Sequence, residues 1–459
     1  MTNSNPSIHD DILSCIGMTP IVRLNRMTEG IRTQVLAKCE FFNPGASVKD
    51  RIGRAIIEDA EERGLIRPGG TIVEATSGNT GVGLALTAAI KGYKCIFTLP
   101  DKMSTEKVRL LKAFGAEVIV TPTVPPEHPD YYVTVAKNIV EDTPNSYFAN
   151  QFYNQVNPET HYKTTGPEIW EQLQGRLDVL VGGLGTGGTI SGVGKFLKEK
   201  DPNVRVVGAD PEGSLFKAFK EGRFDEEGSV YKVEGIGQDK LPETAWLDYI
   251  DEFRTVSDKD SFNVARQLAR REGLFVGGSS GTATKIALDL GRELDDPDKV
   301  VLVILTDTGE RYLSKFHNDE WMRENRFLDE AAGDVRHLLL QKTPAARTLV
   351  SCTSTDTLKQ SLDLMARHNV SQLPVIDHGE SVGSVRESKI MAQVIEKSVQ
   401  LEDPVATAMD PPFPVVGANE SVEYVSRLLG RDNPALLVRV GSELTGILTR
   451  FDVIQAMNS

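Results

Sequence analysis

The sequence predicts an α/β protein of parallel strands wrapped by helices, followed by a smaller α/β part near the C-terminal end. Three observations predict this fold. Short β-branched runs alternate with helical patterns through residues 8–325. Glycine-containing loops join several of these strands to the helices that follow. Residues 300–305 are entirely aliphatic, which is typical of a central strand buried on both faces.

The individual elements follow from spacing and from residues that end helices. Residues 47–63 are expected to form a helix because Ile52, Ile56 and Ala60 recur at helical spacing and Gly64 follows them. Two units of the strand-loop-helix-strand type follow. The strands expected in chain order are residues 71–75, 94–99, 178–182, 204–208 and 300–305, with helices from residue 81 and over residues 190–200.

The C-terminal part differs from the rest and contains an internal repeat. Residues 328–346 are charged and rich in small residues, and they are expected to form a linker. Residues 347–459 nearly repeat themselves with an offset of 63 to 64 residues, so that the segment from Leu373 matches the segment from Leu436. A duplicated β-α-β unit predicts two modules that stack and bury a shared face. The expected division is therefore residues 1–327, 328–346 and 347–459.

Composition excludes several classes of function. The 459 residues include 51 Lys and Arg against 65 Asp and Glu, a net charge of −14, so no nucleic-acid partner is expected. No apolar run is long enough to cross a bilayer and residues 1–10 carry no export signal, so we expect a cytoplasmic protein without a membrane partner. The cysteines are far apart, which predicts free thiols. No metal site is expected, and surface or packing roles are expected for His128 and His161.

The first candidate site is the loop made of Gly185, Thr186, Gly187, Gly188 and Thr189. It lies between an expected strand and an expected helix, at the sheet edge where α/β proteins bind ligands. Glycines let backbone N–H groups approach an anion, and the N-terminus of the helix adds partial positive charge. The loop therefore predicts a phosphate site, with a plain strand-to-helix turn as the alternative.

Two further segments supply groups that could bind or react with a small molecule. Residues 76–80 (Thr-Ser-Gly-Asn-Thr) offer donors that suit a carboxylate, or Thr76 only caps the helix. Lys49 stands at a helix start, where the macrodipole and Arg51 disfavour another positive charge. A lowered pKa would make this amine a nucleophile, and a solvated surface lysine is the alternative. An imine-forming lysine, a phosphate loop and a carboxylate loop are what a pyridoxal-phosphate enzyme acting on an amino acid requires.

Four motifs together carry a family resemblance. The chain resembles the fold-type II pyridoxal-phosphate enzymes over residues 8–325. The motifs that carry the resemblance occur in the order seen in that family, at residues 47–51, 76–80, 185–189 and 277–281 (Gly-Gly-Ser-Ser-Gly). The duplicated tail resembles a tandem pair of CBS-type (Bateman) regulatory modules. The resemblance implies pyridoxal 5′-phosphate as cofactor, small amino-acid substrates and a homodimer or higher homo-oligomer. No haem is expected, since no haem-binding extension precedes the motifs.

The resemblance also implies roles for single residues. Lys49 would hold the cofactor as an imine and then shuttle the Cα proton of the substrate. Residues 185–189 would bind the phosphate, Asn79 the ring hydroxyl, and Ser279 would face the pyridine nitrogen. A hydroxyl at this last position is expected to favour β-elimination over transamination. The substrate carboxylate would be bound by Thr76, Ser77, Thr80 and Gln151.

Two branches of the family are candidates. Cysteine synthases use O-acetylserine and sulfide, whereas the other branch condenses L-serine with L-homocysteine to L-cystathionine and water. The second branch is the one that this chain resembles in the tail and in residues 102–107, 233–237 and 311–322. We therefore expect the condensation of serine with homocysteine. Formation of hydrogen sulfide from cysteine plus homocysteine is expected as a side reaction. A non-enzymatic alternative is an adenosyl-ligand sensor or scaffold with a vestigial catalytic domain. The acceptor side would involve Met103, Ser104, Glu234 and Gly237.

The tail predicts one adenosyl site rather than two. The second repeat ends in a Gly-to-Thr-to-Asp pattern that in CBS-type modules puts Thr449 beside a ribose and Asp452 on its two hydroxyls. The first repeat has Lys389 where an acceptor is wanted. S-adenosylmethionine or another adenosine ligand is therefore expected at the second repeat. The alternative is that Asp452 only places a favourable charge at the start of the last helix.

Overall fold

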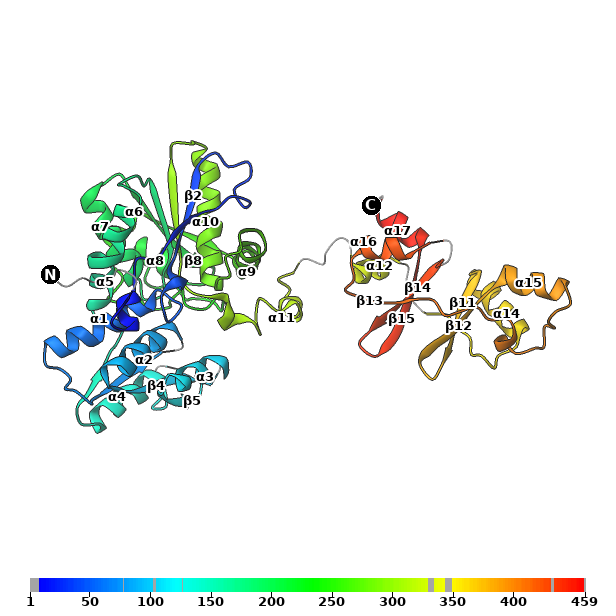
Figure 1. The fold of residues 1–459 in the computed structure, drawn as a ribbon, viewed down its shortest axis with the longest axis horizontal. Coiled ribbons are helices and arrows are strands. Elements are labelled where there is room, and N and C mark those ends of the chain that lie inside the picture. Colours follow the sequence, from blue (N-terminus) through cyan, green and yellow to red (C-terminus); the bar gives the residue numbers. More distant parts are fainter. Residues whose placement is uncertain are drawn as a thin grey trace. The chain divides into compact units, whose positions relative to one another are not determined.

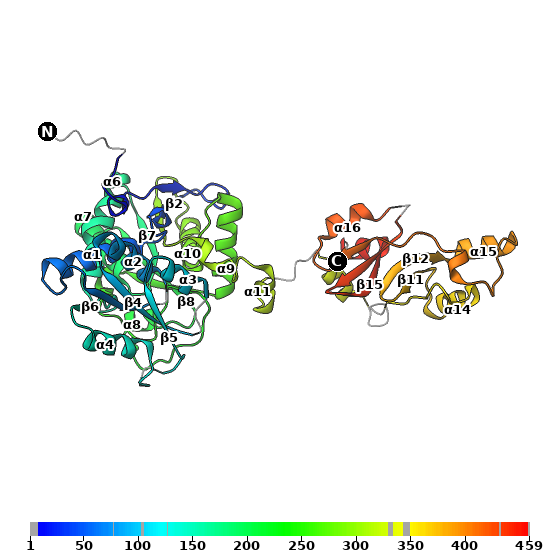
Figure 2. The same ribbon diagram turned by 60° about the horizontal axis from the view of Figure 1, so that its bottom comes forward.

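The computed structural model describes residues 8–76, 78–101, 105–125, 127–328, 334–342, 349–430 and 433–457. The chain divides into two compact units, Met1–Leu328 and Asp329–Ser459. Figures 1 and 2 show the ribbon of each unit in two orientations. Within these described ranges, no helix has the length and hydropathy needed to span a membrane.

The larger sheet of the first unit has six strands in the order β1-β2-β10-β7-β8-β9. Strand β10 (Val300–Leu305) pairs in parallel with β2 and β7, and all six of its residues are buried. The central strand expected from the aliphatic run is therefore confirmed. The other strands are β1 (Ile21–Arg23), which is antiparallel to its neighbour, β2 (Gln34–Cys39), β7 (Val179–Gly183), β8 (Arg205–Pro211) and β9 (Glu252–Val256).

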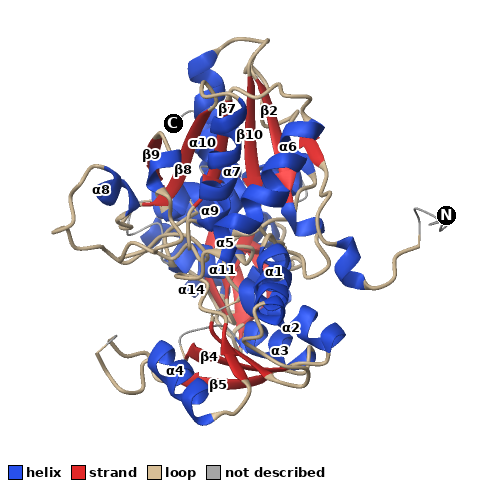
Figure 3. Cartoon of the chain, turned by 90° about the vertical axis from the view of Figure 1, so that its left-hand side faces the viewer, coloured by secondary structure: helices blue, strands red, loops and turns tan. Residues whose placement is uncertain are grey.

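Helices cover both faces of this sheet because the strand side chains alternate between two cores. Val301 and Val303 pack in a core with α10, whereas Leu302 and Ile304 face the core that contains α7. Figure 3 shows α7 and α10 beside the strands. The helices of this part are α5 (Val156–Thr160), α6 (Gly166–Gln172), α7 (Gly188–Lys200), α8 (Phe216–Lys220), α9 (Asp258–Gln267), α10 (Gly278–Leu294) and α11 (Asp319–Glu324). The short helical turns are η1 (Ile12–Cys15), η2 (Glu40–Phe42), η4 (Leu247–Tyr249) and η6 (Gly309–Tyr312), and the π-helical turns are η3 (His161–Thr165) and η5 (Leu268–Glu272).

The smaller sheet of the first unit has four parallel strands in the order β5-β4-β3-β6. Ile52 and Ile56 of α1 share a core with Ile72 and Phe97 of this sheet, so the apolar stripe seen in the sequence faces these strands. The elements are α1 (Lys49–Glu62), β3 (Thr71–Ala75), α2 (Asn79–Lys91), β4 (Lys94–Pro100), α3 (Thr105–Ala113), β5 (Glu117–Thr121), α4 (Tyr132–Asp142) and β6 (Ser146–Phe148). The parallel α/β architecture expected from the sequence is confirmed.

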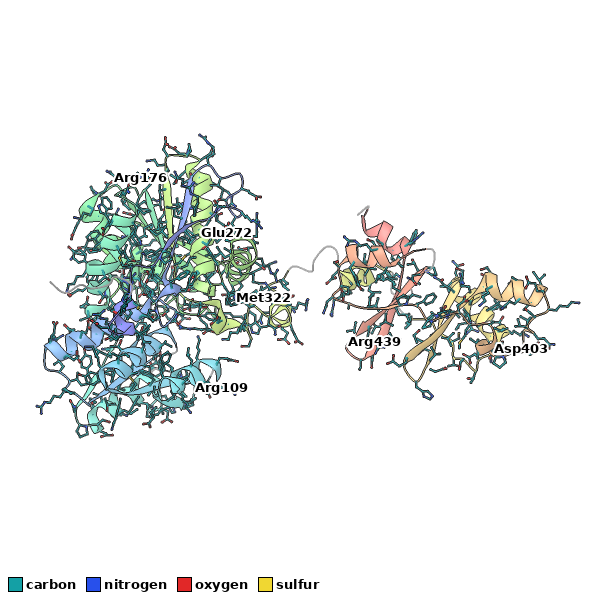
Figure 4. All side chains as sticks on the ribbon, in the orientation of Figure 1. Arg109, Arg176, Glu272, Met322, Asp403 and Arg439 are labelled. Carbon is teal, nitrogen blue, oxygen red and sulfur yellow. The ribbon has the colours of Figure 1, made fainter. Side chains whose placement is uncertain are left out.

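The second unit contains the predicted duplication. Hairpin β11 (Gln372–Asp377) and β12 (Glu380–Arg386) has a counterpart in β14 (Ala435–Val440) and β15 (Glu443–Thr449). Arg439 of β14, labelled in Figure 4, pairs with Glu380 of β12 at 2.6 Å and so joins the two modules. The remaining elements are α12 (Val335–Gln341), α14 (Leu358–His368), α15 (Glu387–Ile395), η7 (Val405–Thr407), β13 (Val415–Gly417), α16 (Val422–Leu428) and α17 (Arg450–Met457).

Helix α12 falls inside the segment that the sequence suggested as a linker. Its residues Val335 and Leu338 are buried in one core with β14, β15 and α17. The helix is therefore packed as part of the second unit.

Candidate active site

A cavity of about 230 Å³ lies where β3, β7 and β10 end. Parallel strands that end at one place present their loops to the same ligand. Gly188 and Glu234 do not line it, and Ser77, Met103 and Ser104 lie outside the described residues. The candidate residues that do line it are Lys49, Thr76, Asn79, Thr80, Gln151, Gly185, Thr186, Gly187, Thr189, Gly237 and Ser279.

Lys49 is the first residue of α1, and its side chain lines the cavity. Burial lowers the pKa of its amine to about 8, while the nearby carboxylates of Asp307 and Glu40 act in the opposite direction. The helix start is held close to α2, since a Cβ on Gly83 would lie 2.5 Å from the carbonyl oxygen of Lys49. An amine with this pKa is partly neutral near pH 8, so it can accept or return a proton.

The loop between β7 and α7 has the conformation expected of an anion cradle. Gly187 has φ +82°, a left-handed conformation that favours glycine, and a Cβ on Gly185 would lie 2.3 Å from the carbonyl oxygen of Gly235. Thr186 and Thr189 line the cavity beside the N-terminus of α7. Backbone N–H groups, a helix N-terminus and two hydroxyls fit a phosphate group.

The loop of residues 76–80 follows strand β3 of the smaller sheet, and Thr76, Asn79 and Thr80 line the cavity. Thr80 donates a hydrogen bond from Oγ1 to Oε1 of Gln151 at 2.5 Å, and Gly78 donates from its N–H to Oγ1 of Thr76 at 3.3 Å. These contacts place the hydroxyls and the amide expected to bind a carboxylate next to each other.

Asn79 belongs to a polar cluster that the sequence did not predict. Its Nδ2 donates to Oδ2 of Asp307 at 2.9 Å, the hydroxyl of Tyr312 donates to the same oxygen at 2.7 Å, and Arg311 donates to Oδ1 of Asn79. Asp307 is 1% exposed and follows β10. Sequence reasoning missed it because its partners lie more than 200 residues away or in a segment singled out only by resemblance.

Ser279 stands at the start of α10, and its Oγ lies 2.8 Å from Oγ1 of Thr306 at the end of β10. Both residues line the cavity. The cavity wall therefore carries a pair of neutral hydroxyls at this point, and the contact of Ser279 with the ring nitrogen that the resemblance implies stays a prediction.

Glu234 lies at the edge of the cavity in an ion-pair network. Lys107 of α3 and Lys315 each donate to its carboxylate, and they hold the pKa of Glu234 below its usual value against the effect of burial. Lys107 also lines the cavity, 5.4 Å above the ring of Tyr312. We call Lys107, Glu234 and Lys315 the charged triad, which carries a net charge of +1.

His161 has a position that sequence reasoning missed. Of the surface and packing roles expected for it, burial excludes the surface role, because the side chain is completely buried, and its Nε2 lies 3.1 Å from Oγ1 of Thr189. Its isolated position in a polar stretch gave no sign of this contact. His128, in contrast, is exposed. No cluster of His, Cys, Asp and Glu within the described ranges could hold a metal ion.

In the second unit, Asp452 already has partners. Its Oδ2 accepts hydrogen bonds from the backbone N–H of Thr449 at 2.7 Å and from the Thr449 hydroxyl at 2.8 Å, and it pairs with Lys342 at 3.0 Å. The first two contacts are what a helix-start role for Asp452 predicts. Lys389, the counterpart in the first repeat, pairs instead with Asp410 at 2.6 Å.

The residues around the cavity fit pyridoxal phosphate. The amine of Lys49, the phosphate cradle at Gly185–Thr189 and the neutral hydroxyl of Ser279 occur in one cavity with a carboxylate-binding loop. Each of these groups matches one part of the cofactor or of an amino-acid substrate.

Comparisons with known proteins agree with this fit. Residues 12–307 match the model of the pyridoxal-phosphate dependent enzyme family, and residues 345–396 and 405–459 match the CBS domain. Cystathionine beta-synthase of Oryctolagus cuniculus is 41% identical over 443 residues, which is 95% of this chain and 80% of the relative.

Two solved structures resemble the first unit. An O-acetylserine dependent cystathionine beta-synthase from Helicobacter pylori has a TM-score of 0.62 and 39% identity, covering 67% of this chain and 98% of that one. A hydrogen sulfide-producing enzyme from Fusobacterium nucleatum has a TM-score of 0.62 and 36% identity, covering 67% of this chain and 100% of that one.

Proposed function

Because the chain belongs to the pyridoxal-phosphate dependent enzymes and, within them, to the cystathionine β-synthases, we propose that it condenses L-serine with L-homocysteine to L-cystathionine and water. The observation that carries the proposal is the convergence of Lys49, the 185–189 loop and the Thr76–Thr80 loop on one cavity. Bound pyridoxal phosphate supplies the electron-withdrawing ring that acidifies the Cα proton of the substrate.

The side chains of this site have separate tasks in the reaction. The amine of Lys49 takes the Cα proton and donates it to the leaving β-hydroxyl, which departs as water. It then takes the proton of the homocysteine thiol and, after the resulting thiolate has added, returns that proton to Cα. A pKa near 8 suits both directions of transfer. Thr76, Thr80 and Gln151 hold the carboxylate of serine, so that Cα lies within reach of Lys49.

Lys49→Ala tests this assignment. We expect the visible absorbance of the bound cofactor and the formation of cystathionine both to be lost, because Lys107, the other described lysine that lines the cavity, is held in an ion pair with Glu234. Spectra of the wild-type protein and of Lys91→Ala, whose amine pairs with Glu61 away from the cavity, provide the reference. An unchanged absorbance band in Lys49→Ala would refute the role of this residue. Failure of the wild-type protein to bind pyridoxal phosphate would favour the sensor or scaffold function.

The charged triad supports homocysteine rather than sulfide as acceptor. Homocysteine as a thiolate carries an ammonium group and two negative groups, so its net charge of −1 complements the +1 of Lys107, Glu234 and Lys315. Sulfide has no carboxylate or ammonium group for these residues to bind. Glu234, Gly237 and the segment around Met103 and Ser104 are proposed to form this acceptor side.

A comparison of two acceptors tests this preference. We expect the kcat/KM for serine plus homocysteine to exceed that for O-acetylserine plus sulfide. Lys315→Gln, which removes one positive charge of the triad, should raise the KM for homocysteine about tenfold, the effect of one lost charged hydrogen bond, and leave the KM for sulfide unchanged. A large preference of the wild type for O-acetylserine plus sulfide would instead identify a cysteine synthase. Hydrogen sulfide release from cysteine plus homocysteine is the proposed side activity.

The finer properties of the protein are proposed on the family resemblance. The division into a catalytic domain over residues 1–327, a linker over residues 328–346 and a regulatory module over residues 347–459 is one of them, with the linker's helix α12 packed against the module. A homodimer or higher homo-oligomer and a cytoplasmic location are others. We also propose a single S-adenosylmethionine site at Thr449 and Asp452, which the acceptor capacity of the Asp452 carboxylate supports.

A further inference from the structure

Thr186 and Thr189 each have one hydroxyl hydrogen, and its direction decides whether they attract or repel an anion. A hydroxyl that points its hydrogen away presents lone pairs to the phosphate and repels it. Among the described residues, the charged side chains that line the cavity are Lys49 and Lys107, and Lys107 pairs with Glu234. Binding of a phosphate in the 185–189 loop therefore depends on neutral donors whose direction is controlled.

The acceptor positions of the Thr186 hydroxyl are filled by its neighbours. Oγ1 accepts from Nδ2 of Asn157 at 2.9 Å and from the backbone N–H of Gly188 at 3.4 Å. A flip of the Asn157 amide would break a second hydrogen bond, because the same Nδ2 also donates to the carbonyl oxygen of Gln151 at 2.9 Å. With both lone pairs engaged, the hydrogen of Thr186 remains for an acceptor in the cavity.

His161 stands in the same relation to Thr189. Its Nε2 lies 3.1 Å from Oγ1 of Thr189, and its Nδ1 lies 2.9 Å from Oγ1 of Thr165. Complete burial lowers the pKa of the ring to about 3, so the imidazole is neutral and carries one hydrogen. If Nε2 carries it, Thr189 accepts from the ring and keeps its own hydrogen for an anion. If Nδ1 carries it, Thr189 must donate to the ring instead.

The helix that carries both residues is held against the loop by glycines. A Cβ on Gly188 would lie 2.1 Å from Oδ1 of Asn157, and a Cβ on Gly192 would lie 2.0 Å from the carbonyl oxygen of Pro158. Asn157 and His161 are one helical turn apart and so share a face, and the π-helical turn η3 begins at His161. This close approach brings two side chains behind the two threonines.

We propose that Asn157 and His161 are positioning residues that direct the hydroxyl hydrogens of Thr186 and Thr189 toward the cofactor phosphate. In this arrangement Thr165 donates to Nδ1 of His161, and the Nε2–H of His161 donates to Thr189. The proposal rests on the proposed function, since it takes the 185–189 loop as the phosphate site. It assigns His161 a directed hydrogen bond rather than a positive charge.

The test compares the affinity of the full-length protein for pyridoxal phosphate with that for pyridoxal, which lacks the phosphate. We expect His161→Leu and Asn157→Leu each to weaken the binding of pyridoxal phosphate about tenfold and the binding of pyridoxal less than about twofold. His161→Gln should recover most of the loss, because its amide can donate from a place close to that of Nε2. Thr164→Val, which removes a hydroxyl bonded to Thr160 on the same turn, is the matched control.

The outcomes separate this proposal from the proposed function. Equal weakening of both ligands in His161→Leu would show a purely structural role, and no weakening would show no role; either result overturns the proposal. Nitrogen NMR of the holoenzyme, with His161→Gln to assign the signal, should find the hydrogen on Nε2, and a hydrogen on Nδ1 would also overturn it. If the wild type binds pyridoxal but gains nothing from its phosphate, the phosphate site itself is wrong, and both proposals fail.

Discussion

Glu74 shows at the scale of a residue how burial sets a property that the sequence does not reveal. It lies in β3, is 1% exposed, and its Oε2 has no hydrogen-bond partner among the described residues. Burial raises the pKa of its carboxyl from the ordinary value of about 4.5 to about 8, against the effect of hydrogen bonds from Asn150 and Gln151. Between these values the folded protein holds a proton that the unfolded chain has lost. The free energy of unfolding therefore falls as the pH rises from about 4.5 to about 8.

Glu74→Gln should remove this dependence while it keeps the shape of the side chain. We expect the melting temperature of the variant to exceed that of the wild type by a few degrees at a pH above 8 and to match it near pH 5. Thermal unfolding at several pH values measures the difference between the two curves. Glu117→Gln, at an exposed position of β5, is the control and should follow the wild type throughout. Parallel curves for Glu74→Gln and the wild type would contradict the prediction.

Single residues differ in how far the sequence could predict them. Lys49 was predictable because a lysine at a helix start conflicts with local electrostatics, and the conflict is visible within a few residues. Asp307 and His161 were not, because each acquires its role through a partner distant in the chain: Asn79 for Asp307 and Thr189 for His161. Only the fold brings these pairs together.

At the scale of elements, the contact of α1 with α2 fixes the position of Lys49. A Cβ on Gly53 would lie 2.3 Å from the carbonyl carbon of Gly83, and backbone atoms cannot move aside as a flexible side chain can. Gly53→Ala should therefore push the two helices apart, with a loss of about 1–3 kcal/mol of stability and a lower cofactor occupancy. Urea unfolding and the cofactor absorbance would measure these effects. Gly417→Ala is the control because its nearest neighbour would be a glutamate side chain at 3.9 Å, and a Gly53→Ala variant as stable as the control would refute the argument.

Elements with a clear pattern were predictable and others were not. The aliphatic β10 and the amphipathic α1 agree with expectation because one pattern determines each. The segment α5-η3-α6 has no such pattern, since its packing against α7 depends on glycines at positions 188 and 192 of another helix. The hydrophobic periodicity of α5-η3-α6 cannot reveal a contact that depends on glycines in α7.

At the scale of the whole molecule, the sequence predicted two units and the duplication in the second one. The spacing of 63 residues between the two hairpins was visible as a repeat. The ion pair between Lys342 and Asp452 was not, because Lys342 lies outside the repeated segment. This pair matters for the proposed adenosyl site, since the two side chains are 12% and 11% exposed and a ribose would need the same carboxylate.

A ligand at Asp452 must therefore displace the ammonium of Lys342, which leads to a prediction for the intact chain. Titration calorimetry with S-adenosylmethionine should find one site, abolished by Asp452→Ala and unaffected by Lys389→Ala. Lys342→Met should bind the ligand more tightly, about threefold to tenfold, because no ion pair has to be broken first. The ligand should also raise the melting temperature of the second unit as its concentration exceeds the Kd, since it binds only the folded module. Two binding sites, or binding that does not depend on Asp452, would contradict this view. Weaker binding by Lys342→Met would contradict it as well, because Lys342 would then be a ligand-binding residue rather than a competitor for the carboxylate.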